Sequence, residues 1–119
     1  MLASLIPLSV FASSEVTAID LTLTKPKIGE APSYTATVTD GSGLEVISVK
    51  WSPSDDVFIE GKTYTVTIEV GIKEGFDGTF AKADKISATM NGYKIHRVKN
   101  NGANVTVKFG WNLSADKPV

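Results

Sequence analysis

Residues 51–72 read WSPSDDVFIEGKTYTVTIEVGI and contain the clearest structural signal in the chain. From position 63 onward, apolar side chains alternate with threonine and glutamate. The apolar members of this run are Tyr64, Val66, Ile68, Val70 and Ile72. A period of two is the signature of a β-strand that buries one face, because successive side chains point to opposite sides. We therefore predict a strand over residues 63–72, whose apolar face the rest of the chain covers.

The residues on either side of Trp51 extend this pattern. Residues 45–52 alternate again, which predicts a strand with Ile47, Val49 and Trp51 on one face. The polar loop that follows contains Asp55 and Asp56. We expect Phe58 to return to the interior before the chain turns at residues 61–62.

Five further runs of alternating residues predict strands over positions 16–24, 34–39, 85–90, 93–99 and 103–111. Their expected inward side chains are Ile19, Leu21, Leu23, Tyr34, Ala36, Val38, Ile86, Ala88, Met90, Tyr93, Ile95, Val105, Val107, Phe109 and Trp111. Turn signals separate the runs at residues 40–43, at Asn91-Gly92 and at residues 100–102. No segment has a helical period. About seven short strands in residues 15–113 predict an all-β fold, an immunoglobulin-like (Ig-like) antiparallel β-sandwich, followed by a tail over residues 114–119.

Composition restricts the partners. The 119 residues carry 12 basic and 13 acidic side chains, so there is no excess positive charge for nucleic-acid binding. The chain has no cysteine, which excludes disulfides and thiolate chemistry. Its length suits one domain.

Residues 1–14 read MLASLIPLSVFASS and contain no charged side chain. An apolar run followed by small residues, with Val10 and Ala12 at the −3 and −1 positions of a cleavage site, predicts a secretory signal peptide. The run is shorter than the ~20 residues that span a bilayer. We therefore expect a secreted or cell-envelope protein with no stable membrane span once the signal is removed.

The spacing of these elements resembles Ig-like repeat modules of bacterial secreted and cell-surface proteins. The matching positions are 21–22, 25–26, 29–32, 49–53, 58–64, 66–68, 75–76, Phe80, 91–92 and 105–109. This resemblance implies a bacterial module that spaces or displays other domains, with neighbouring domains possible if the chain is a fragment. It implies no catalytic residues.

Residues that could carry chemistry are few. His96 is the only histidine, no G-x-S-x-G sequence is present, and the neighbours of His96 take the inward positions. We therefore expect His96 on a solvent face, no enzymatic activity, no cofactor and no transition-metal site. Calcium is an alternative for the acidic loops at Asp55, Asp56 and Glu60, or at Asp40 and Asp77, although no Asp-x-Asp-x-Asp-Gly run exists. Solubilising turn residues are the preferred interpretation.

The remaining candidates concern binding. Asp55, Asp56, Phe76 and Asp77 are the residues we select as a possible binding loop. Aromatic side chains could alternatively stack on sugars, and the candidates are Phe76, Phe80, Tyr93 and Trp111; all but Phe76 are expected in the core. An exposed edge strand could also accept a partner strand. We expect a non-enzymatic structural or adhesive module that binds a protein or a surface, with a carbohydrate-binding module as the alternative.

Overall fold

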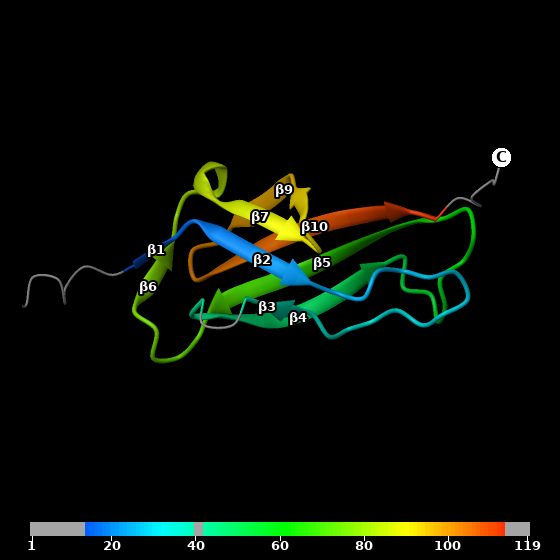
Figure 1. Cartoon of the computed structure of the whole chain (residues 1–119), viewed down its shortest axis with the longest axis horizontal. Coiled ribbons are helices and arrows are strands. Elements are labelled where there is room, and N and C mark those ends of the chain that lie inside the picture. Colours follow the sequence, from blue (N-terminus) through cyan, green and yellow to red (C-terminus); the bar gives the residue numbers. More distant parts are fainter. Residues whose placement is uncertain (1–13, 40–41, 114–119) are drawn as a thin grey trace, which may run out of the picture.

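The computed structural model describes residues 14–39 and 42–113 (Figure 1). Its strands are β1 (Ser14–Val16), β2 (Ala18–Thr22), β3 (Thr37–Val38), β4 (Leu44–Ser52), β5 (Thr63–Ile72), β6 (Gly78–Phe80), β7 (Ser87–Met90), β8 (Tyr93–Ile95), β9 (Arg97–Asn100) and β10 (Asn104–Asn112). A single 3₁₀ turn, η1 (Ala83–Lys85), precedes β7. The predicted signal segment up to residue 13, part of the turn at 40–43 and the predicted tail lie outside the described residues.

The described strands form two four-stranded sheets and a short pair. One sheet has the order β4-β5-β10-β9, the other has the order β3-β2-β7-β8, and β1 pairs with β6. In Figure 1 the two larger sheets lie as layers along the long axis of the molecule. The prediction of an all-β chain is confirmed.

One apolar core lies between the two sheets. The first sheet contributes Trp51, Tyr64, Val66, Ile68, Val70, Val105 and Val107, and the second contributes Ile19, Leu21, Ala88, Met90 and Ile95. All four inward positions of β5 from Tyr64 to Val70 are fully buried. The predicted strand over 63–72 is confirmed, and β5 is paired on both sides, with β4 and with β10.

The expectation of purely antiparallel sheets was wrong at the start of the chain. β1 runs parallel to β6, and β2 runs parallel to β7 while pairing antiparallel with β3. Alternation shows that a segment is a strand but carries no information on the direction of its neighbour. The inward positions Ile19, Leu21 and Leu23 were nevertheless correct, since all three are buried.

The prediction for β4 was wrong at Ile47, whose side chain is 51% exposed. The β4–β5 register shifts between Val46 and Ser48, so one extra residue is inserted in β4. A bulge of this kind moves a side chain out of the alternation. Leu44 and Trp51 are buried on either side of it, and the Ile47 side chain lies over Gly71 of β5.

The predicted strand over 34–39 is reduced to the two residues of β3, and Tyr34 is 57% exposed rather than inward. The backbone before β3 serves another purpose: the indole Nε1 of Trp51 donates a hydrogen bond to the Ser33 carbonyl at 2.7 Å. A chain segment that pairs with no strand has no reason to keep its side chains in alternation.

The predicted strand over 93–99 is divided at His96. β8 belongs to the second sheet and β9 to the first, so the chain changes layers between them. His96 is exposed at this crossing, as predicted. The Asn91-Gly92 turn is confirmed, because both residues have positive φ angles, 52° and 89°.

Candidate functional site

The polar contacts at one end of the molecule centre on Asp55, in the β4–β5 loop. Its Oδ2 accepts a hydrogen bond from the Tyr64 hydroxyl at 2.6 Å and one from Lys62 Nζ at 2.9 Å. The same hydroxyl accepts a hydrogen bond from the Ile59 N–H at 2.9 Å. Asp55 and Ile59 of the loop are thereby tied to Tyr64 of β5 and to Lys62 just before it.

These contacts shift the ionisation of all three side chains. The Tyr64 hydroxyl, and then Lys62, lower the pKa of the Asp55 carboxyl below its ordinary value. The hydrogen bond to Asp55 raises the pKa of Lys62. Burial, and then the bond to Asp55, raise the pKa of Tyr64. Asp55 is therefore engaged in holding the loop.

An aromatic series runs from this loop into β10. The centroid of the Phe58 ring lies 4.8 Å from that of Tyr64 and 5.1 Å from that of Trp51, and both contacts are edge-to-face. The ring centroids of Trp51 and Trp111 are 5.5 Å apart, and those of Trp111 and Phe109 are 4.9 Å apart. Edge-to-face contacts add to the apolar burial of the rings. The prediction that Phe58 returns to the interior is confirmed, since it is buried.

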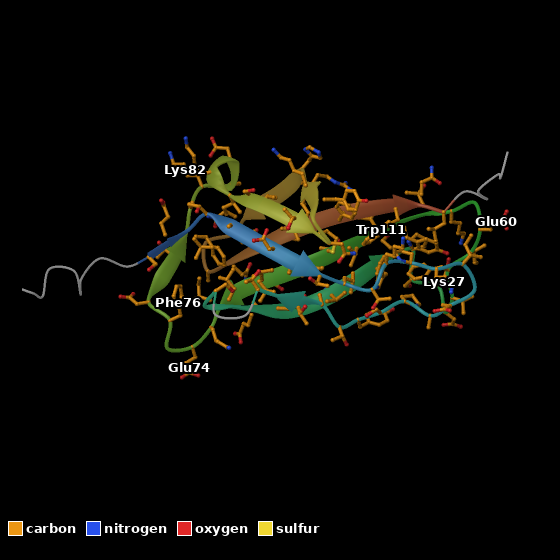
Figure 2. The ribbon with its side chains drawn as sticks, viewed as in Figure 1. Lys27, Glu60, Glu74, Phe76, Lys82 and Trp111 are labelled. Carbon is orange, nitrogen blue, oxygen red and sulfur yellow. The ribbon has the colours of Figure 1, made fainter. Side chains whose placement is uncertain are left out.

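The four residues selected as a binding loop do not come together. Asp55 and Asp56 belong to the β4–β5 loop, whereas Phe76 and Asp77 belong to the β5–β6 loop. Figure 2 shows Phe76 and Glu74 at one end of the molecule and Glu60 at the other. The Phe76 ring is half-buried and packs on Gly43 and Gly78. A Cβ atom added at Gly43 would lie 2.4 Å from the ring, and one added at Gly78 would lie 2.5 Å from it.

No group of three or more metal-binding side chains occurs within residues 14–39 and 42–113. Of the sugar-stacking candidates, Phe80 is buried as expected, whereas Trp111 is half-buried. Tyr93 is 71% exposed, which contradicts its expected place in the core. Its direction was nevertheless correct, because Tyr93 pairs with the fully buried Met90 and cross-strand partners share a face.

Tyr93 is exposed because the opposite sheet is incomplete there. β9 pairs with β10 only from Val105 to Lys108, although β10 continues to Asn112 and is paired with β5 throughout. At Phe109 and Gly110, β10 thus has no strand on its second side among the described residues. An inward side chain on β8 is therefore not covered by a strand of the opposite sheet at this point.

Two adjoining hollows occupy this gap, and we call them together the β8–β10 groove. The first, of about 340 Å³, is lined by Lys25, Tyr93, Phe109, Gly110, Trp111 and Asn112. The second, of about 210 Å³, is lined by Lys94, His96, Arg97, Lys108, Phe109 and Gly110. Figure 2 shows Trp111 on β10, away from the end that carries Phe76.

The charged side chains lining the groove are all basic: Lys25, Lys94, Arg97 and Lys108. None of them forms an ion pair with another described residue. The ion pairs among the described residues are Lys27–Glu30 and Lys62–Asp55. None of these basic residues was among the candidate site residues predicted from the sequence. The spacing in sequence could not show that Lys25, from the segment that follows β2, joins them.

Comparison of the chain with protein-family models, with curated proteins and with solved structures finds no match. Within the described residues, no helix has the length and apolar character needed to traverse a bilayer.

Proposed function

We propose that this chain is a non-enzymatic Ig-like module of a bacterial secreted or cell-surface protein, with a structural role and an adhesive one. The observation that carries the proposal is that the described chain enters and leaves the domain at opposite ends of its long axis (Figure 1). Segments attached at the two ends are kept apart by the body of the two sheets.

Both ends are hydrogen-bonded into that body. The N–H of Ser14 donates to the Asp77 carbonyl at 3.1 Å, and β1 then pairs with β6. At the other end, the Leu113 N–H donates to the Lys62 carbonyl at 2.9 Å, and the Gly61 N–H donates to the Leu113 carbonyl at 2.7 Å. β5 alone bridges about 34 Å, taking ten residues at roughly 3.4 Å each. The domain therefore has the properties of a stiff spacer.

Export is the first part of the proposal to test. The full chain with a C-terminal epitope tag is expressed in a bacterium, and medium, envelope and cytoplasm are separated. We expect the tag outside the cytoplasm. Leu5→Arg, which places a charge in the apolar run, retains it in the cytoplasm, whereas the apolar Leu5→Ile does not. Cytoplasmic location of the unaltered chain contradicts the proposal.

Adhesion is tested with beads that carry the purified domain, applied to immobilised cell-envelope preparations. We expect retention that is lost when the surface is treated with protease. Failure of the beads to bind any envelope surface contradicts the adhesive role. It does not affect the spacer role, which depends on the positions of the two chain ends.

Carbohydrate binding is the second candidate. It is favoured by the exposure of Tyr93 next to Phe109 and Trp111, because an open aromatic surface suits a sugar ring. The same bead assay separates the two candidates. Loss of retention after periodate oxidation of the surface, but not after protease, supports the carbohydrate alternative.

A further inference from the structure

The backbone of Gly110 offers an unused pair of hydrogen-bonding groups inside the β8–β10 groove. At the β9–β10 hairpin the Asn101 N–H donates to the Asn104 carbonyl at 2.8 Å. In an antiparallel ladder every second opposed pair is hydrogen-bonded, so the bonded pairs continue through Lys99–Thr106 to Arg97–Lys108. The next residue of β10 that faces this side is Gly110, which β9 does not reach because β9 begins at Arg97, opposite Lys108.

Gly110 is exposed, and no described residue bonds its backbone on that side. Its flanking residues Phe109 and Trp111 turn their backbone groups to β5 and their side chains to the inner face of the sheet, where both line the hollow that Tyr93 also lines. A strand placed beside Gly110 thus meets one free N–H and one free carbonyl, with aromatic side chains on its inner face. This is the geometry of β-strand addition.

The two faces of such an added strand meet different chemistry. Side chains opposite Phe109 and Trp111 point inward, toward Tyr93, where a medium-sized apolar group fits the hollow of about 340 Å³. Side chains opposite Gly110 point outward, on the face that carries the exposed Lys108 and Arg97. Opposite charges at neighbouring positions on one face of a sheet stabilise the pairing.

We propose that the β8–β10 groove binds an extended acidic peptide that pairs with Gly110 in the place β9 leaves vacant. Its apolar side chains enter between Tyr93 and Trp111, and its alternate carboxylates face Lys108 and Arg97. The inference rests on the proposed adhesive function and assigns the chemistry of the partner. An acidic saccharide would match the charges, but it has no alternating amide groups with which to satisfy Gly110.

The probe is a fluorescein-labelled peptide, GEVEVEVG, whose binding to the full chain is followed by fluorescence anisotropy at low salt. The glutamate opposite Gly110 directs its N–H at β10, as do the other glutamates of the alternating sequence, whereas the valine N–H groups face away. We therefore expect N-methylation of the glutamates to weaken binding at least tenfold and N-methylation of the valines to change it less than threefold. Equal effects of the two modifications would overturn the proposal.

Protein variants test the same site from the other side. The double variant Lys108→Glu, Arg97→Glu is expected to bind the peptide at least tenfold more weakly. Tyr93→Ser, at an exposed position, is expected to bind it severalfold more weakly. The double variant Lys73→Glu, Lys82→Glu makes the same charge change at exposed positions outside the groove and serves as the matched control, with less than twofold effect. Thermal denaturation checks that each variant is folded.

Amide chemical shifts locate the peptide independently of affinity. Saturable binding that shifts the Gly110 amide supports the proposal. No saturable binding, or shifts confined to other strands, overturns it, as does binding of oligogalacturonate to the groove without binding of the peptide. If the peptide fails while the envelope-bead retention persists in the double variant, the adhesive function stands and uses a different surface.

Discussion

The side-chain amide of Asn91 is hydrogen-bonded to both backbone groups of Leu23. The Leu23 N–H donates to Asn91 Oδ1 at 3.0 Å, and Asn91 Nδ2 donates to the Leu23 carbonyl at 2.8 Å. The amide thus continues the β2–β7 pairing by one step beyond its last backbone pair, Leu21–Met90. One residue both forms the β7–β8 turn and holds the end of β2.

The two roles of Asn91 can be separated by substitution. Asn91→Gly keeps the positive φ that the turn requires but removes both amide bonds, and we expect a loss of about 1–3 kcal/mol in the free energy of unfolding. Asn91→Ala adds the strain of a side chain at positive φ and should lose more. Urea denaturation measures both. If the glycine variant is as stable as the parent, the amide bonds contribute nothing net.

The Asp55 carboxylate makes stability depend on acidity. Its pKa is lowered in the folded state, first by the Tyr64 hydroxyl and then by Lys62. The stabilisation is therefore present above the unfolded pKa of 3.8 and is lost as the pH falls through the lower folded value. Asp55→Asn should show a shallower loss of stability below about pH 4. Asp56→Asn, at the exposed neighbouring position, is the matched control.

Removal of the Tyr64 hydroxyl tests the loop from the opposite side. Tyr64→Phe keeps the ring against Phe58 but leaves the Ile59 N–H without its acceptor, so we expect lower stability. It also removes the largest cause of the lowered Asp55 pKa. The acid titration of Asp55, followed by carboxyl NMR shifts, should move upward; an unchanged titration would contradict the assigned cause.

Ile47 and Ile68 occupy equivalent positions in the sequence pattern but not in the structure. Ile68 is fully buried, and Ile68→Ala should cost ~2–5 kcal/mol. Ile47 is half-exposed at the bulge, and Ile47→Ala should cost less than ~1 kcal/mol. Comparable losses in chemical denaturation would place Ile47 in the core and rule out the bulge.

Phe76 and Gly78 are expected to be energetically coupled. A Cβ at Gly78 would lie 2.5 Å from Phe76 Cε2 and 3.0 Å from the Ser14 carbonyl oxygen. Gly78→Ala should therefore destabilise by ~1–3 kcal/mol, as overpacking does. In the Phe76→Leu background much of this cost should disappear. A double-mutant cycle measures the coupling, and additive losses would mean that the ring is not the obstacle.

Local signals predicted much of the fold. The alternation of residues 63–72 identified β5 and its buried face, and the Asn91-Gly92 pair identified a turn that needs positive φ at both positions. Such features depend on neighbouring residues, so a single sequence contains them. The candidate groove was not predicted as a site, because its residues come from β8, β9 and β10 and from the segment that follows β2.

Sequence alone determined most of the strands and, for most of those, which side is apolar, because the pleat gives each strand a period of two. Tertiary structure decided what covers each apolar side. The bulge in β4 turned Ile47 outward. The change of layer at His96 kept β9 from extending beside the end of β10 and left Tyr93 without a covering strand. Alternation describes the direction of a side chain relative to its own backbone, whereas burial depends on a second strand that a distant part of the chain must supply.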